Sequence, residues 1–339
     1  MKKVVVIGGA GYIGTVLTDL LIKKKNNVVC IDIFKFGKKP IEKFIKNNKF
    51  KYFKINTSNT NKIIKISSNA HSVVDLSGIV GDPACDVNKK NTYNSNYYNT
   101  LKILNALNGK NINRFIYASS CSVYGSSEGE KLITEKSKVK PISLYAELKI
   151  KCEKYILLNK FDYSTTVLRL ATVFGYSFRQ RFDLVVNLFT LFSYLNKKIM
   201  VFGGEQYRPN VHVYDVAMAI YKCILAEKKK INGQIFNVGS NNLNHKIKDL
   251  AAIVAKNNKK SKIEIKKTLV DKRNYHIDFS KIKKILKFKV KYNIYSGSRD
   301  LYLKFKINKI LSKNLIRYSN LKIEAKKYAK NTKYKQRVK

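Results

Sequence analysis

Two side chains at helical spacing suggest acid–base chemistry. The stretch "SLYAELK" (143–149) places Tyr145 and Lys149 four positions apart in a segment with helical periodicity. On a helix, side chains at this spacing leave the same face, so an ammonium group would lie beside a phenol. A phenol beside a cation, in a partly dry cleft, ionises more readily and can take a proton from a hydroxyl group. In a chain so rich in lysine and tyrosine the pair also arises by chance, so its surroundings decide.

A glycine-rich turn opens the chain. The stretch "VVVIGGAGYIG" places Gly8, Gly11 and Gly14 three residues apart, between an apolar run and an apolar helical segment. Glycines at these positions allow a tight strand-to-helix turn, a close approach of backbone to a pyrophosphate, and a helix N-terminus aimed at its charge. The pattern predicts a dinucleotide site whose cofactor-binding residues include Gly8, Gly11, Tyr12, Ile13 and Gly14.

An acidic residue at the end of the next apolar run refines this prediction. Asp32 follows Gly14 by 18 residues. A carboxylate there binds the hydroxyl groups of the adenosine ribose and repels a 2′-phosphate, which favours NAD over NADP. The alternative is a structural glycine turn in an α/β domain without a ligand.

Short β-branched runs alternate with longer helical segments in the first half of the chain. This alternation predicts an α/β fold, a doubly wound parallel sheet of the Rossmann type with helices on both faces. The expected strands are 3–8, 27–33, 50–56, 71–77, 113–120 and 164–175, and the expected helices are 12–25, 92–108 and 143–160.

The alternation of strand-like and helix-like segments becomes less regular after Gly175. We expect residues 1–175 to form the dinucleotide-binding domain and residues 176–320 to form a smaller C-terminal substrate-binding lobe, with a strand near 234–239 returning to the sheet. Helices are expected within 180–195, 211–228 and 245–257. The tail at 321–339 is basic and without apolar periodicity, so it is expected to be frayed.

The charge of the chain is strongly positive. Among 339 residues, 68 are Lys or Arg and 22 are Asp or Glu, for a net charge of +46. Such a balance is typical of proteins that bind polyanions. Here only nine of the cations are arginine and the lysines are spread along the whole chain. We therefore interpret the charge as compositional drift and expect no nucleic-acid partner.

Compartment and metal content are also bounded by the composition. The five cysteines lie far apart with no Cys-x-x-Cys pair, as expected of free thiols in a reducing cytoplasm, and the four scattered histidines predict no metal site. No apolar run approaches the ~20 residues of a membrane span. Lys2 and Lys3 before the first apolar run resemble the start of a signal peptide, but the spaced glycines and the missing cleavage site favour a cytoplasmic protein.

Together these motifs resemble the extended short-chain dehydrogenase/reductases, in the group of nucleotide-sugar epimerases and dehydratases. The resemblance is carried by "GGAGYIG", "ASSCSVYG" (118–125) and "YAELK" (145–149), supported by "RPNVHVYDVA" (208–217). It implies NAD as cofactor, a nucleotide-diphosphate sugar as substrate and a homodimer built on helices 92–108 and 143–160. It also implies a catalytic triad of Ser120, Tyr145 and Lys149, in which Tyr145 and Lys149 also contact the cofactor and Ser120 also contacts the substrate.

Two residues after the triad serine narrow the reaction. In the 4,6-dehydratases of this family an Asp and a Glu follow the matching Ser or Thr, whereas here Cys121 and Ser122 follow. Elimination of water is therefore disfavoured. We predict an epimerase that acts by transient oxidation at C4 of the sugar. The alternatives are a C4 dehydrogenase or ketoreductase with net redox change, and a non-catalytic protein that senses a dinucleotide or binds a polyanion.

The loop "LSGIVGDPACDVN" (76–88) resembles one branch of the family. The resemblance implies that the backbone of Leu76, Ser77 and Gly78 runs past the nicotinamide. For Asp82 and Cys85 a role in the site and a simple turn remain open.

Four arginines fall in segments where the family binds the substrate diphosphate. The guanidinium group suits this task because its planar fork binds phosphate oxygens in pairs. The competing interpretation is ion pairing at the surface. His212 is expected to pack or to cap a helix. The predicted substrate-binding residues besides Ser120 are Arg179, Arg181, Arg208 and Arg273, with Asn187 as a further candidate.

Three positions depart from the family pattern. Asn56 stands where many relatives have an acid for the adenine amino group, and its carbonyl oxygen can still accept a hydrogen bond. Asp75 stands where a histidine is usual, and Thr172 where an asparagine often follows the sixth strand. None of the three belongs to the triad.

Overall fold

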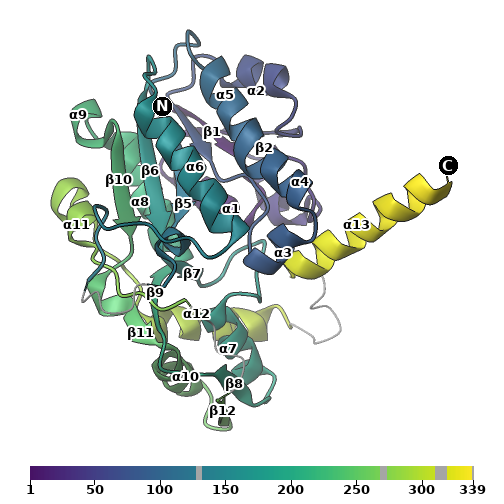
Figure 1. Ribbon diagram of the computed structural model, residues 1–339, viewed down its shortest axis with the longest axis vertical. Coiled ribbons are helices and arrows are strands. Elements are labelled where there is room, and N and C mark those ends of the chain that lie inside the picture. The colour runs from purple at the N-terminus through teal and green to yellow at the C-terminus, as the bar shows by residue number, and fades with distance from the viewer. Residues whose placement is uncertain (127–131, 268–272, 310–318, 338–339) are drawn as a thin grey trace.

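A seven-stranded parallel sheet forms the centre of the protein (Figure 1). The computed structural model describes residues 1–126, 132–267, 273–309 and 319–337. The strand order is β10-β6-β5-β4-β1-β2-β3, and every pair is parallel. The strands are β1 (Lys3–Ile7), β2 (Asn27–Asp32), β3 (Phe50–Lys54), β4 (Ser72–Asp75), β5 (Arg114–Ser120), β6 (Ser164–Leu170) and β10 (Gln234–Val238). The doubly wound parallel sheet is confirmed. β10 pairs with β6 at the edge of this sheet, although it follows residue 175.

Helices cover both faces of this sheet. Strands with helices on both faces are buried throughout, which explains continuous apolar runs such as the one in β1. One face is covered by α1 (Tyr12–Lys23), α8 (Val213–Leu225) and α11 (Ser280–Leu286). The other face is covered by α2 (Thr60–Ser67), α5 (Asn99–Ala106) and α6 (Leu144–Leu158).

The helix expected at 92–108 is interrupted. It consists of α4 (Lys89–Tyr93), the π-turn η2 (Asn94–Tyr98) and α5. Within the π-turn, the Asn96 side chain accepts a hydrogen bond from Ile79 N and donates one to Ile79 O, both 2.7 Å. Single π-turns are common at functional sites. Here the turn fixes the segment that follows β4.

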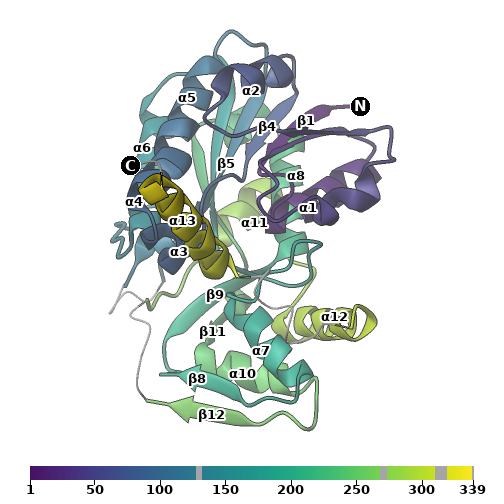
Figure 2. The same cartoon turned by 90° about the vertical axis from the view of Figure 1, so that its right-hand side faces the viewer.

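The strand expected at 164–175 is also divided. After β6 the chain leaves the central sheet at Ala171 and continues as β7 (Thr172–Phe174). β7 pairs with β9 (Tyr207–His212), which pairs with β11 (Asn244–Lys246). This second sheet carries the chain into the lobe in the lower part of Figure 2.

The lobe packs three helices around its own core. These helices are α7 (Val185–Tyr194), α10 (Ile247–Ala255) and α12 (Ile294–Ile307), and the core includes Phe189 and Leu250. A two-stranded sheet of β8 (Ile199–Phe202) and β12 (Ile263–Lys266) lies at its edge. The remaining short elements are η1 (Lys39–Phe44), α3 (Asp82–Asp86), η3 (Cys121–Tyr124), α9 (Lys228–Ile231) and η4 (Asn241–Leu243).

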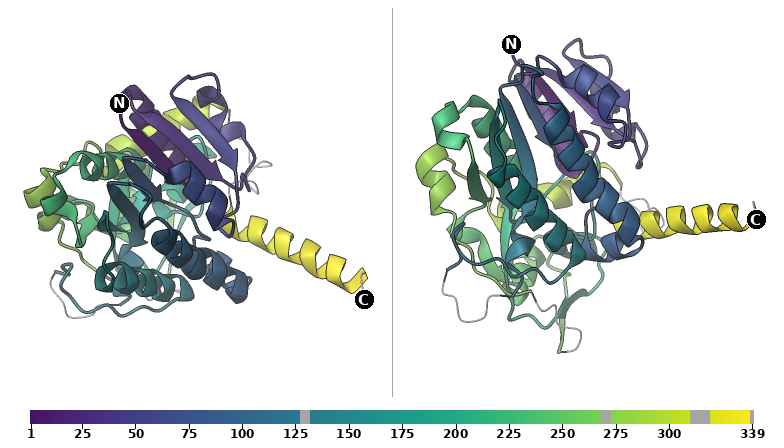
Figure 3. Two further views of the ribbon diagram at one scale, coloured as in Figure 1. Left: turned by 90° about the horizontal axis from the view of Figure 1, so that it is seen from above. Right: turned by 45° about the horizontal axis from the view of Figure 1, so that its top comes forward.

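Residues 320–337 include most of the basic tail that the sequence predicts to be frayed. They form one helix, α13 (Asn320–Arg337), whose first residues pack against the domain of the central sheet and whose far end projects away from the body (Figure 3). Ala, Lys and Glu favour helix, and docking of Asn320 and Glu324 supplies tertiary contacts that periodicity does not reveal.

The described residues include no helix with both the length and the apolar character that crossing a membrane requires. Across the same residues, His, Cys, Asp and Glu side chains form no cluster of three or more that could hold a metal ion.

Candidate active site

A cleft of about 370 Å³ lies at the carboxyl ends of the central strands. Open α/β sheets bind their ligands at this edge. The cleft gathers segments that are far apart in the sequence, namely the glycine turn, the ends of β2, β4 and β5, the start of α6 and part of the lobe. The sequence-predicted residues in its wall are Gly8, Gly11, Tyr12, Ile13, Gly14, Asp32, Asn56, Leu76, Ser77, Gly78, Ser120, Tyr145, Lys149, Arg179, Arg181 and Arg273.

The glycine turn is too tight for side chains. Gly8 has φ +79°, and a Cβ at Gly14 would lie 2.5 Å from the oxygen of Gly8. Gly11 N donates to Gly8 O at 3.0 Å and precedes the first turn of α1, whose N-terminal residues line the cleft. Backbone without side chains, at a helix N-terminus, fits the pyrophosphate of a dinucleotide.

Asp32 stands at the end of β2 and is fixed by backbone. Its carboxylate accepts hydrogen bonds from Ala10 N at 3.1 Å and from Phe34 N at 2.7 Å. Burial raises its pKa despite these hydrogen bonds. The side chain thus joins the glycine turn to β2 in the part of the wall where a ribose would lie next to the phosphates.

Asp75 holds the loop at 76–78. Its carboxylate is 1% exposed and accepts from Ser77 N at 2.9 Å, from Ser77 Oγ at 2.6 Å and from Thr100 Oγ1 at 3.3 Å. Burial raises the pKa of Asp75. The departure from the usual histidine therefore has a structural role beside the cleft. Asn56 also lies in the wall, and its carbonyl oxygen accepts from Ser58 N at 3.1 Å.

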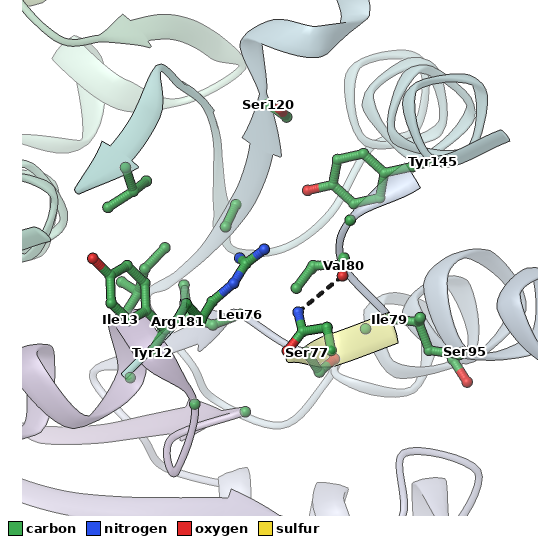
Figure 4. A pocket seen from close by; sticks show the side chains of 18 of the residues that line it. Tyr12, Ile13, Leu76, Ser77, Ile79, Val80, Ser95, Ser120, Tyr145 and Arg181 are labelled. Atoms are coloured by element: carbon green, nitrogen blue, oxygen red, sulfur yellow. Dashed lines mark hydrogen bonds between the residues drawn. The ribbon is translucent and has the colours of Figure 1, made fainter. Parts of the chain in front are cut away.

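Ser120 and Tyr145 enter the cleft from opposite elements (Figure 4). Ser120 ends β5, and Ser122 donates to its hydroxyl oxygen through N at 3.1 Å and Oγ at 2.9 Å. Tyr145 lies in the first turn of α6, where Ser143 Oγ accepts from Ala146 N at 3.3 Å as the helix cap. The Tyr145 ring directs its hydroxyl into the cleft.

The electrostatics around Tyr145 oppose ionisation. Burial raises the pKa of the phenol, whereas Arg181 and the Ser120 hydroxyl lower it. The ammonium of Lys149 lies 5.7 Å from the centre of the Tyr145 ring and donates to Ala118 O at 2.6 Å. Bringing a phenol from pKa ~10 to ~7 requires about 4 kcal/mol, and burial of Tyr145 adds to this cost.

A third side chain on the same face of α6 anchors this helix. Glu153 follows Lys149 by one more helical step and forms a buried ion pair with Arg169 on β6, 2.6 Å between Oε2 and Nη2. Ser119 donates a short hydrogen bond to the same carboxylate. Because Ser119 precedes Ser120, the network connects the helix of Tyr145 to the strand of Ser120.

Asp82 has a role beyond its turn. Its carboxylate accepts from Ser143 Oγ at 2.9 Å and pairs with Arg273 Nη1 at 2.9 Å. It therefore joins the cap of α6 to the lobe across the cleft. Cys85 is buried, and its thiol donates to Ile79 O at 3.3 Å.

The predicted substrate-binding residues do not all lie together. Arg181 is in the wall and pairs with Asp183 at 2.7 Å, and Arg179 is buried in the same wall. Arg208 is outside the wall and donates to the backbone of Tyr207 and Arg273.

Asn187 is also outside the wall and fully buried. Its amide nitrogen donates to Tyr12 OH at 3.0 Å and its oxygen accepts from Gly175 N at 2.8 Å. The expectation for His212 is confirmed, since Nδ1 accepts from Tyr214 N as the cap of α8 and the ring stacks on Tyr292.

Sequence reasoning missed two wall residues on α13. Asn320 and Glu324 are 6% and 9% exposed and line the cleft. The surrounding basic sequence gives no signal for them. Thr172, noted only as a departure, and Tyr275 also lie in the wall.

Comparison with known proteins fits this geometry. The model of the NAD dependent epimerase/dehydratase family matches residues 4–239. The chain belongs to this family. An uncharacterised UDP-glucose epimerase of Bacillus subtilis is 27% identical over 84% of this chain and 92% of its own length. The UDP-glucuronate 4-epimerase of Thermodesulfobacterium geofontis is 26% identical over 86% of this chain and 92% of its own length.

Solved structures with the same fold include two proteins described as UDP-sugar 4-epimerases. The crystal structure of a UDP-glucuronic acid 4-epimerase from Bacillus cereus, with UDP-glucuronic acid and NAD, has a TM-score of 0.80 at 24% identity and covers 90% of this chain and 99% of that one. A UDP-glucose 4-epimerase from Thermotoga maritima, with UDP-glucose, has a TM-score of 0.80 at 22% identity and covers 91% and 100%.

Proposed function

We propose that the protein is an NAD-dependent nucleotide-sugar epimerase that acts by transient oxidation at C4 of the sugar. The observation that carries the proposal is the single cleft that holds the glycine turn, Asp32 and the triad of Ser120, Tyr145 and Lys149. Family membership and relatives described as UDP-sugar 4-epimerases support it.

The residues of the chain divide the work as follows. The glycine turn and Asp32 hold NAD, which when bound supplies the acceptor and donor of hydride. Ser120 receives two hydrogen bonds from Ser122, so its own proton is directed to the phenol or to the sugar hydroxyl. Burial keeps the phenol of Tyr145 protonated in the protein without ligand, and the positive charge of bound NAD would lower its pKa. As the phenolate, Tyr145 then takes the hydroxyl proton from the sugar and later returns it. Lys149 and Arg181 supply positive charge on the side of the phenol.

Elimination of water is not supported. Cys121 is buried outside the wall, and its thiol donates to Arg169 O at 3.3 Å. Ser122 is engaged with Ser120. Neither side chain supplies the acid and base that a dehydratase needs at these positions.

Tyr145→Phe tests the proposal. It removes one oxygen and keeps the ring that lines the cleft, so NAD binding is expected to stay within about twofold of wild type. Epimerisation of UDP-glucose or UDP-glucuronic acid, followed by NMR of the sugar, is expected to fall by at least ~10³-fold, because the loss of the base leaves only positioning. Turnover retained in the variant excludes Tyr145 as the base. Net accumulation of NADH with wild type supports the dehydrogenase alternative.

We also propose that the chain divides into residues 1–175 and residues 176–320, and that the second part contributes elements to the first. In support, α8 packs on α1 and β10 joins the central sheet, although both follow residue 175. The five cysteines are free and buried, which suits the reducing cytoplasm that we propose as the location.

A homodimer through the helices of 92–108 and 143–160 is proposed on the exposed apolar side chains there. Tyr98, Leu157 and Leu158 are 50%, 39% and 82% exposed. Light scattering on the purified protein tests it: a mass near twice 39.0 kDa supports the dimer, and a monomer mass excludes it.

A further inference from the structure

Arg179 belongs to the part of the cleft that the glycine turn forms. Its guanidinium lies 3.6 Å from the centre of the Phe36 ring, in the loop that follows Asp32. Its backbone N donates to Ser177 Oγ at 3.3 Å, and that hydroxyl donates to Tyr12 O at 2.7 Å. The segment of Arg179 is therefore attached to the start of α1. Arg181, two residues later, lies instead between Tyr12 and Tyr145.

No direct ion pair neutralises the charge of Arg179 among the described residues. Its side chain is buried at 4% exposure and forms no ion pair within the part of the chain that the structure describes. Nη1 donates to Gln180 O at 3.3 Å, whereas the buried Nε has no hydrogen-bond partner. Asp183 and Asp32 act on this charge only without direct contact, since Asp183 pairs with Arg181 and Asp32 accepts from two backbone N–H groups.

A buried cation without a direct ion pair favours an anionic ligand. Burial, followed by repulsion from Arg181, lowers the pKa of Arg179 to about 9. A buried charge without a partner is unfavourable, and a hydrogen-bonded anion removes that penalty. The guanidinium fork suits phosphate oxygens. The anion that the glycine turn places beside it is the diphosphate of a dinucleotide.

The C-terminal helix holds Arg179 in place. Asn320, the first residue of α13, accepts from Arg179 Nη2 at 2.5 Å and donates to Val80 O at 2.9 Å, the dashed line in Figure 4. One turn later Glu324 pairs with Lys35, in the loop after β2. These contacts attach α13 to the loops after β2 and β4, on two sides of the cleft.

We propose that Arg179, positioned by Asn320 of α13, binds the diphosphate of the dinucleotide, and that the start of α13 is a wall of the cofactor site. This inference rests on the proposed NAD-dependent function. It moves Arg179 from the substrate diphosphate, where the sequence placed it, to the cofactor. It also gives the basic C-terminal segment a task in cofactor retention.

The affinities for a series of four ligands test the inference. Dissociation constants for adenosine, ADP, NAD and UDP are measured by equilibrium dialysis on the full chain and on Arg179→Gln. Loss of a charge-assisted hydrogen-bonding group is expected to weaken ADP and NAD by roughly 10- to 100-fold. The dissociation constants of adenosine and UDP are expected to be unchanged. Adenosine carries no diphosphate, and the diphosphate of UDP is not the one that the dinucleotide places beside Arg179.

Two further variants control the experiment. Asn320→Ala keeps the charge of Arg179 but removes the side chain that positions it, so the affinities for ADP and NAD are expected to fall by a few fold. Arg299→Gln removes an equal charge from an exposed site on α12 and is expected to change none of the four constants. Thermal midpoints monitor folding. If Arg179→Gln does not fold, the four dissociation constants of Asn320→Ala test the inference in its place.

The outcomes separate this inference from the proposed function. Unchanged ADP and NAD binding in Arg179→Gln overturns the inference, as does an equal loss for adenosine, which indicates a general defect of the wall. Weaker UDP with unchanged ADP returns Arg179 to the substrate. If the wild-type chain binds neither NAD nor ADP, the proposed function itself fails.

Discussion

Neutralising Glu153 is expected to destabilise the protein strongly. The two oxygens of this carboxylate accept from Arg169 Nε at 3.1 Å and Nη2 at 2.6 Å, and from Ser119 Oγ. The side chains of Arg169 and Glu153 are 6% and 3% exposed. In Glu153→Gln an amide N–H₂ replaces one acceptor, so the arginine charge stays buried without a counterion. Breaking a buried pair in this way costs about 3–5 kcal/mol in the free energy of unfolding.

Urea-induced unfolding followed by circular dichroism measures this cost. The matched control is Glu264→Gln, which breaks exposed pairs with Lys198 and Lys266, whose side chains are 63% and 48% exposed. Exposed pairs contribute little to stability, so the control is expected to stay close to wild type. Replacing both partners, as Glu153→Met with Arg169→Met, removes the unpaired charge and is expected to recover much of the lost stability.

The same change reports on the active site. Glu153, Lys149 and Tyr145 share a face of α6, and Ser119 precedes Ser120. We therefore expect the folded Glu153→Gln protein to lose turnover as well as stability. Two results refute the assigned role of the buried pair. One is a loss below 1 kcal/mol in the free energy of unfolding of Glu153→Gln. The other is a double variant that loses more of this free energy than the two single variants lose together.

Three further outcomes are expected. Asp32→Ala removes the charge that repels a 2′-phosphate, so the ratio of NADP to NAD dissociation constants is expected to fall at least tenfold, and an unchanged ratio places Asp32 away from the ribose. Gly14→Ala puts a Cβ 2.5 Å from the backbone oxygen of Gly8, so NAD affinity is expected to fall by ~10²-fold or more in a dialysis assay, while wild-type affinity contradicts the tightness of the turn. Burial raises the pKa of Tyr145, so its phenol stays protonated at neutral pH in the protein without ligand. The absorbance difference at about 295 nm between wild type and Tyr145→Phe is therefore expected to show no tyrosinate below pH ~10. An absorbance step near pH 7 contradicts this expectation.

Site features that only one residue type can supply were predictable from the sequence. Gly14 tolerates no side chain, and Tyr145 and Lys149 stand at a fixed helical spacing, so both motifs can be found without coordinates. The parallel sheet was equally accessible, because strands buried on both faces have continuous apolar runs.

Residues whose role depends on tertiary contacts were not predictable. Asn320 belongs to the cleft only because α13 returns to Val80 and Arg179, at sequence separations of 240 and 141. The same limit applies to Asn187, which the sequence placed at the substrate and the structure places behind Tyr12. An arginine pattern likewise does not distinguish a guanidinium beside the glycine turn from one beside the phenol.

The fate of the hydrogen at C4 tests the central claim most directly. UDP-glucose deuterated at C4 is incubated with the enzyme and NAD, and the sugar is examined by NMR and mass spectrometry. Transient oxidation within one cleft predicts that the inverted sugar keeps its deuterium at C4 and that the cofactor shows no net reduction. Exchange of the label with water, or its accumulation in free NADH, contradicts the account.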